Sequence, residues 1–438
     1  MSWQNEYNKK LMTPNEAVDA FMKDGDTVYM GGLTVASEVL NAMFDKVKEG
    51  NLKGISLEGN LITNELPLAD PELTEDKIRY RSFFFGGYER MGYKAKNVTF
   101  VPVQFNNFPL YMREVVKPDV SVIMVTPPDE NGNFNLGPFG SGFNSIAREV
   151  SKKLVVQVNK NIPRVYGLDL NLSVDQVDAI VEFDSAVPEY PMAETSEIDQ
   201  KIADYIIDMI PDGACIQLGL GGMSNAVGYG LKDKKHLGIH TEMLTESMKF
   251  LIENGAVDNS RKAFIPGKSV IGFTLGNKEL YDFVNNNEDL YFASYELTNN
   301  VFNIMKNDNM ISINTAMSID LSGQVCSENI GFRHFSGTGG QVDYIRGAVH
   351  SKGGKSFLAI SSTVNTKAGL TSKIVLDFPP GGATTALRSD VQYIVTEHGC
   401  VNLFGEDLPT RAKKLISIAD PAFREQLTFD AKKNGLIY

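Results

Sequence analysis

One glycine-rich segment of the chain has residue types and spacing that could do chemistry at a helix start. In residues 219–226 (GLGGMSNA), glycines stand between the strand-like CIQL and a helix. Free N–H groups at that helix start could hold a phosphate or an oxyanion. The same pattern is also typical of a tight strand-to-helix turn. It matches neither GxGxxG nor the P-loop, so it indicates no nucleotide type.

Three carboxylates end strand-like segments. Glu242 ends LGIHTE, where we predict that a strand meets a helix close to the glycine loop. It could react, or it could only be an N-terminal helix acid that the helix dipole favours. Glu58 ends KGISLE and holds the matching place in the first half of the chain. Glu397 ends YIVTE, and it could orient a reacting group or cap a turn.

A second glycine-rich segment is residues 335–343 (FSGTGGQVD), which suggests backbone closing over a ligand or a flexible surface loop. Asn314 lies in the strand-like ISINTAM. An amide in an apolar strand needs a hydrogen-bond partner, and this could be a ligand or neighbouring backbone.

The elements that must position these residues look like one unit used twice. Each half contains a helix, a DG turn, a short apolar strand, a pair of glycines and another helix. Thr13 is predicted to cap the first helix through a capping box with Glu16, and Ser196 to cap the corresponding later helix. Gly219 follows Gly31 by 188 positions, and two other matched segments are 184 and 191 apart. This near-constant offset indicates internal duplication.

Strands that alternate with helices predict an α/β fold with mostly parallel sheets. We expect a first domain at residues 1–190 and a second at 191–438, joined in the Pro- and acid-rich segment 187–195. Two similar domains facing each other predict an interdomain cleft. Ligands in open α/β sheets lie beyond the carboxyl ends of the strands.

Composition excludes several other classes. The 438 residues carry a net charge of −12 and no Lys/Arg-rich block, so we expect no nucleic-acid binding. The three separated cysteines and the absence of an apolar leader or long apolar run predict a cytoplasmic protein that spans no membrane. His236 and His240 flank a strand-like LGI, so we expect no metal site there.

Taken together, the motifs resemble the family I CoA-transferases grouped with acetyl-CoA hydrolases, in particular the butyryl-CoA:acetate and 4-hydroxybutyrate CoA-transferases. The resemblance covers nearly the whole chain. The stretches that carry it are QLGLGGMSNAVG, LGIHTEM, INTAMSIDLSGQV, FSGTGGQVDYIRGA, SKGGKSFLAISSTVNTK, YIVTEHGCVNLFG, and, in the first half, MVTPPDENGNFNLGP and PRVYG. Ser224 stands where many relatives have proline, and serine is itself a good helix cap.

This resemblance implies a tandem pair of NagB/RpiA/CoA-transferase-like α/β domains and a glutamate nucleophile, Glu242. It implies that Asn314 and Glu397 lie close to the reacting carboxylate. Residues implied to contact CoA are Gly219, Leu220, Gly221, Gly222, Met223, Met317 and Gly340.

The implied activity is transfer of CoA from a short acyl-CoA, with butyryl-CoA preferred, to acetate through a glutamyl-CoA thioester. CoA would be substrate and covalent intermediate, with no permanently bound cofactor, and the enzyme would form a homo-oligomer. Alternatives are a 4-hydroxybutyrate CoA-transferase and a hydrolase that uses the same glutamate. A sugar-phosphate sensor would need an output domain, for which the duplication leaves no segment.

Overall fold

The computed structural model describes residues 2–367 and 369–438, which form two compact units. The first unit contains Met1–Tyr190 and Ile271–Leu297. The second contains Pro191–Val270 and Thr298–Tyr438. The segment Ile271–Leu297 therefore lies with the first unit, although it follows the join expected near residue 190. No helix in the described ranges is long and apolar enough to cross a membrane.

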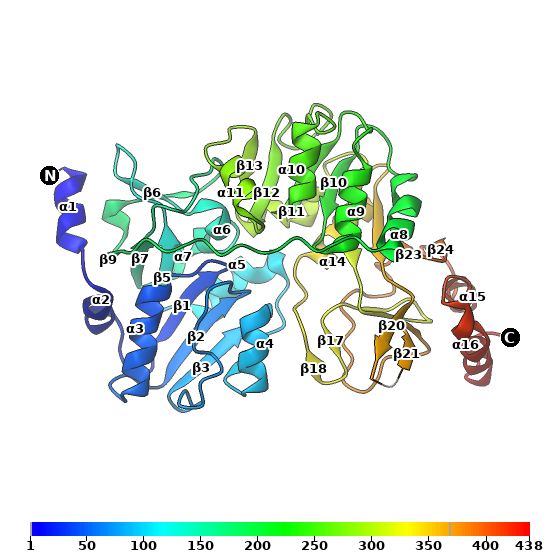
Figure 1. Ribbon diagram of the computed structural model, residues 1–438, viewed down its shortest axis with the longest axis horizontal. Helices are drawn as coiled ribbons and strands as arrows, with labels where there is room; N and C mark the ends of the chain where they lie inside the picture. The colour runs from blue at the N-terminus through cyan, green and yellow to red at the C-terminus, as the bar shows by residue number, and fades with distance from the viewer. Residues whose placement is uncertain (1, 368) are drawn as a thin grey trace. The chain divides into compact units, whose positions relative to one another are not determined.

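The first unit is built on a seven-stranded sheet with the order β4-β3-β2-β1-β5-β7-β9, whose recorded pairings are all parallel (Figure 1). Its strands are β1 (Thr27–Gly32), β2 (Ile55–Asn60), β3 (Ile78–Ser82), β4 (Val98–Phe100), β5 (Val120–Val125), β7 (Lys153–Val158) and β9 (Ala179–Glu182). A small antiparallel pair, β6 (Asn133–Asn135) and β8 (Asn171–Ser173), lies outside it.

The second large sheet repeats this plan with the order β13-β12-β11-β10-β14-β19-β23-β24. Strand β24 runs antiparallel to β23 at one edge. The strands of this second sheet are β10 (Cys215–Leu218), β11 (Gly238–Leu244), β12 (Ser269–Thr274), β13 (Leu290–Phe292), β14 (Met310–Thr315), β19 (Lys355–Ala359), β23 (Tyr393–Thr396) and β24 (Gly399–Asn402).

Short strands extend the second unit. They are β15 (Ser318–Asp320), β16 (Val325–Cys326), β17 (Asn329–Ile330), β18 (Arg333–His334), β20 (Thr363–Thr366), β21 (Gly369–Ser372) and β22 (Ile374–Val375).

The helices of the first unit are α1 (Trp3–Lys10), α2 (Pro14–Phe21), α3 (Ser37–Lys48), α4 (Gly87–Lys94), α5 (Phe108–Tyr111), α6 (Gly137–Gly140), α7 (Ala147–Val150) and α11 (Lys278–Val284). Three short 3-10 turns (Phe105–Asn107, Asn144–Ile146 and Val174–Gln176) and a π-helical turn (Met112–Val116) join them.

The other helices are α8 (Glu197–Ile207), α9 (Gly222–Gly230), α10 (Glu246–Glu253), α12 (Tyr295–Thr298), α13 (Val301–Ile304), α14 (Gln341–His350), α15 (Leu408–Ser417) and α16 (Pro421–Lys433). Both expected caps are confirmed. Thr13 and Glu16 form the capping box that begins α2, and the Ser196 side chain accepts the N–H of Asp199 at the start of α8.

Corresponding strands occupy the same places in the two sheets, which confirms a two-domain α/β fold with mostly parallel sheets. Strand β10 lies between β11 and β14 as β1 lies between β2 and β5. Strands β1, β5 and β10 are buried almost throughout, as expected for parallel strands covered on both faces. Most of the candidate residues lie within or directly after strands β10, β11, β14 and β23, and Gly340 precedes α14; all of these belong to the second unit.

Candidate active site

Glu242 lies inside strand β11 rather than at a helix start. The strand continues to Leu244, and the helix α10 begins only at Glu246. Thr245 is the cap of that helix, since its side chain accepts the N–H of Met248. The expectation that Glu242 stands where the strand meets the helix is therefore wrong, because the helix begins four residues later. Glu242 is thus not an acid of the first helical turn that the helix dipole would stabilise.

The Glu242 carboxylate is half-buried and held by two groups of the second unit. The Asn299 side-chain amide donates to Glu242 Oε2 at 3.0 Å, and the backbone N–H of Gly340 also hydrogen-bonds to the carboxylate. Any larger residue at 340 would place its Cβ on Glu242 Oε2 and on Asn299 Nδ2. The structure thus brings Gly340 and Glu242 into direct contact.

Asn299 is a site residue that the sequence analysis did not single out. It is fully buried, and its Oδ1 accepts a hydrogen bond from Thr298 Oγ1 at 2.9 Å. Its Nδ2 also donates to Asp343 Oδ2 at 3.2 Å. The amide therefore presents both N–H groups to carboxylates, one of them on Glu242. The only sequence signal was a pair of asparagines in ELTNNV, after a short helix.

Burial raises the pKa of Glu242 from its ordinary value of 4.5 to about 7. The hydrogen bonds from Asn299 and Gly340 act in the opposite direction, because they stabilise the charged form. A carboxylate nucleophile must be ionised in order to attack a carbonyl carbon. A pKa near 7 still leaves a large fraction of the carboxylate ionised at neutral pH, and a more basic carboxylate is a better nucleophile.

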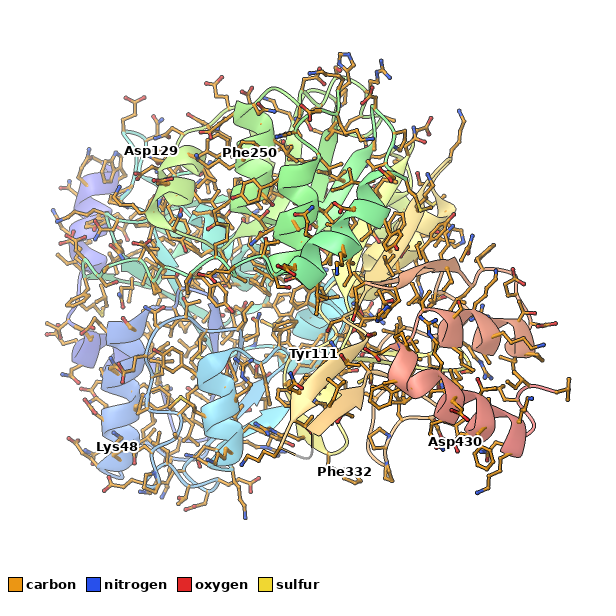
Figure 2. All side chains as sticks on the ribbon, turned by 45° about the vertical axis from the view of Figure 1, so that its right-hand side comes forward. Lys48, Tyr111, Asp129, Phe250, Phe332 and Asp430 are labelled. Carbon is orange, nitrogen blue, oxygen red and sulfur yellow. The ribbon has the colours of Figure 1, made fainter. Side chains whose placement is uncertain are left out.

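Glu58, the matching carboxylate of the first unit, has different partners. It lies in β2 and is 1% exposed. Tyr111, labelled in Figure 2, donates to its Oε2 at 2.8 Å, and Arg81 Nη1 lies 2.8 Å from its Oε1. Burial raises its pKa to about 7 as well. Both of its oxygens are thus occupied by side chains, one of them a cation.

The glycine loop after β10 lets the chain turn into α9. Gly221 has φ +117°, a conformation that favours glycine, and α9 begins at Gly222. A Cβ at Gly222 would overlap the backbone oxygen of Glu194. Leu220 is 43% exposed, whereas Met223 is buried. The backbone at the start of α9 is therefore tightly packed on one side, while Leu220 points to solvent.

The structure places the remaining candidates in separate contacts. Asn314 forms a reciprocal pair of amide hydrogen bonds with Gln217, at 3.1 and 3.2 Å. Glu397 accepts from the backbone N–H and the hydroxyl of Ser362, at 2.9 and 2.6 Å. Met317 is half-buried, and its N–H donates to the backbone oxygen of Cys326.

Comparisons with known proteins agree over the whole chain. The model of the acetyl-CoA hydrolase/transferase N-terminal domain matches residues 1–190, and the C-terminal domain model of the same family matches residues 276–431. A 4-hydroxybutyrate coenzyme A transferase of Clostridium kluyveri is 38% identical over 99% of this chain and 100% of its own length.

Two further relatives support the same grouping. A butyryl-CoA:acetate CoA-transferase of Anaerostipes caccae is 36% identical over 99% of this chain and 98% of its own. The crystal structure of RipA from Yersinia pestis superimposes with a TM-score of 0.93 at 34% identity, and 100% of both chains is covered.

Proposed function

The chain belongs to the acetyl-CoA hydrolase/transferase family, and from that premise we propose that it transfers CoA from an acyl-CoA to a free carboxylic acid. The observation that carries the proposal is the half-buried Glu242 carboxylate, which an amide and a backbone N–H hold and which has no ion-pair partner among the described residues. By analogy with the named relatives, butyryl-CoA and acetate are the preferred pair, with 4-hydroxybutyryl-CoA as the alternative acyl donor.

The chemistry requires a carboxylate that can be acylated and then released. Ionised Glu242 attacks the thioester carbonyl, and the C–S bond breaks to give a mixed anhydride and the CoA thiolate. The thiolate attacks the glutamyl carbonyl, and the anhydride C–O bond breaks to release the first acid. A second carboxylate attacks the resulting glutamyl thioester, and the same steps in reverse release its CoA ester. The thioester energy is retained throughout.

Each addition step places negative charge on a carbonyl oxygen beside Glu242. The Gly340 N–H and the Asn299 amide are the donors nearest to that carboxylate. Such donors each contribute about 10²–10³-fold to acyl transfer in comparable sites. We therefore assign Gly340 and Asn299 to oxyanion stabilisation and to orientation of Glu242.

The other assignments follow from the resemblance. Gly219–Met223 and Met317 would contact CoA, and Asn314 and Glu397 would lie near the reacting groups. The division into domains at 1–190 and 191–438, an interdomain cleft and a homo-oligomeric state stay predictions.

A kinetic panel tests the proposal. The purified protein is given acetyl-, propionyl-, butyryl- and 4-hydroxybutyryl-CoA, each with and without a competing acid. We expect new acyl-CoA to form with ping-pong kinetics, which give parallel lines in double-reciprocal plots. Little free thiol should form when no acceptor carboxylic acid is present. Rapid thiol release without acceptor would assign the chain to hydrolysis by the same glutamate, and no turnover with any pair would refute both activities.

The pH dependence of transfer follows from the Glu242 pKa. Since the pKa of about 7 means that the nucleophile loses its charge below that pH, kcat/KM for the acyl-CoA should fall about ten-fold per pH unit on the acid side. It should level off above about pH 8. The measurement is a pH–rate profile with one acyl-CoA donor and a saturating concentration of the acceptor carboxylate. A flat profile from pH 5 to 8 would contradict this prediction.

Replacement of Asn299 by alanine should move this profile. The variant lacks a hydrogen bond that favours the charged form of Glu242, so its apparent pKa should rise by about one unit. The rate at pH 6 should fall more than the rate at pH 8. Loss of rate by an equal factor at every pH would show that Asn299 does not tune the carboxylate.

A further inference from the structure

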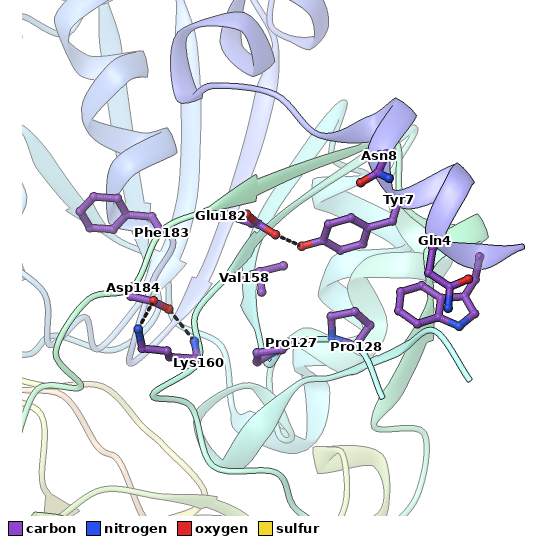
Figure 3. A pocket seen from close by; sticks show the side chains of 11 residues that line it. Gln4, Tyr7, Asn8, Pro127, Pro128, Val158, Lys160, Glu182, Phe183 and Asp184 are labelled. Atoms are coloured by element: carbon purple, nitrogen blue, oxygen red, sulfur yellow. Dashed lines mark hydrogen bonds and ion pairs between the residues drawn. The ribbon is translucent and has the colours of Figure 1, made fainter. Parts of the chain in front are cut away.

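A cavity of about 630 Å³ lies in the first unit, beyond the carboxyl ends of three parallel strands (Figure 3). Pro127 and Pro128 follow β5, Lys160 follows β7, and Glu182 ends β9. Helix α1 closes one side with Trp3 and Tyr7. This volume is typical of small-molecule sites, and the carboxyl edge of an open α/β sheet is where such ligands bind.

The strand registers show that the duplicated chain has the same construction in both units. Val155 pairs with Ala179 in the first sheet as Phe357 pairs with Tyr393 in the second. Counting along the chain from these pairs places Lys160 opposite Ser362, and Asp184 one residue beyond the position of Glu397.

The contacts follow the same correspondence. The Lys160 N–H donates to Asp184 Oδ1 at 3.0 Å, as the Ser362 N–H donates to Glu397 Oε2 at 2.9 Å. The cavity is therefore the first unit's counterpart of the region around Glu397, which we place near the reacting groups.

The charged groups of the cavity leave one carboxylate without a cation. Lys160 Nζ lies 2.6 Å from Asp184 Oδ2, so these two side chains neutralise each other. Glu182 Oε1 accepts from the Tyr7 hydroxyl at 2.6 Å. In the described part of the chain, no cationic group lies within 4 Å of Glu182. The lining consequently carries one uncompensated negative charge, which disfavours CoA and other anions.

Apart from the amide side chains of Gln4 and Asn8, the remaining lining is aromatic and apolar. Trp3 and Tyr7 lie edge to face with ring centroids 6.5 Å apart, and Pro128 and Val158 add apolar surface. Ring faces attract cations, and an open carboxylate binds an ammonium group. We propose that this cavity is a second ligand site, which binds an organic ammonium ion with its charge at Glu182 and its apolar body against Trp3 and Tyr7.

The chain provides its own reporter for a test, because Trp3 is its single tryptophan. The full-length protein is titrated with benzylammonium, benzyl alcohol and benzoate, which have similar shapes and different charges. We expect a saturable change in Trp3 fluorescence with benzylammonium and a Kd at least ten-fold lower than for benzyl alcohol, with benzoate weakest. Calorimetry on the same samples detects binding that does not alter the indole.

Variants locate the effect. Glu182→Gln keeps an oxygen that can accept from Tyr7, so the fold should survive, and the preference for benzylammonium should fall about ten-fold. Asp45→Asn removes the same charge from an exposed position on α3 and should leave the preference unchanged. Equal affinity for the three probes, no binding by either method, or equal losses in both variants would overturn the proposal.

Discussion

Replacing Glu242 by glutamine should reduce CoA transfer by about 10⁴-fold or more, because the amide cannot form the anhydride or the thioester. Incubation of the wild type with acyl-CoA alone should add CoA covalently to the peptide that contains Glu242. The variant should show no such adduct in intact-protein or peptide mass spectra. An active Glu242→Gln protein would remove this residue as nucleophile.

The raised pKa of Glu242 also predicts how the stability of the Glu242→Gln variant compares with that of the wild type. A carboxyl whose pKa is raised from 4.5 to about 7 contributes stability that is complete below pH 4.5 and is lost as the pH rises through 7. Glutamine does not titrate, so at pH 8 Glu242→Gln should be at least as stable as the wild type. Loss of activity together with unchanged or higher Tm at pH 8 then reports chemistry rather than unfolding.

Glu58→Gln is the matched control, since Glu58 holds the same strand position and has the same pKa of about 7. Its oxygens already accept from Tyr111 and pair with Arg81, so it is poorly placed to attack a thioester. The control protein should still form the covalent CoA adduct at Glu242. An adduct on Glu58 would mean that the first unit contains the nucleophile.

Much of the fold follows from the local sequence because the duplicated halves repeat strong local signals. The capping box of Thr13 and Glu16 and the cap at Ser196 depend only on neighbouring residues, and both are present. The near-constant offset of matched segments anticipated two sheets with corresponding strand order. The boundary of Ile271–Leu297 was not visible, because its attachment depends on distant contacts. One is the stacking of Tyr295 on Phe105, with ring centroids 4.8 Å apart.

The parts of the candidate site that the sequence could not predict also depend on contacts between residues that are far apart in the chain. Asn299 is 57 residues from Glu242, and the asparagine pair to which it belongs does not indicate which residue it contacts. Asn314 was equally visible as an amide in an apolar strand, but its partner is Gln217 on the neighbouring strand β10. The end of β11 was misplaced because Thr245, rather than Glu242, supplies the cap of α10. Sequence patterns located the strands and glycine turns well, whereas pairings between side chains required the folded chain.

Gly340→Ala should be nearly as damaging as loss of the nucleophile, for a steric reason alone. Gly340 has φ −96°, which any residue can adopt, so alanine brings no backbone strain. Its Cβ would instead occupy the space of Glu242 Oε2 and Asn299 Nδ2. Both groups must move, and the N–H of residue 340 loses its alignment with the carboxylate. Displacement of about 1 Å and loss of one oxyanion donor predict a fall in kcat/KM of about 10³-fold.

The measurement separates chemistry from folding and from binding. Because the overpacking is confined to two side-chain ends at the start of α14, Tm should fall only modestly, in line with about 1–3 kcal/mol for an added methyl group. Gly87→Ala at the start of α4 is the control. A Cβ there meets nothing within 4 Å, so activity should be unchanged and stability equal or slightly higher. If Gly340→Ala kept the wild-type rate and formed the Glu242–CoA adduct normally, then Gly340 would not be the backbone donor that the reaction uses, and the oxyanion would have to be stabilised from elsewhere.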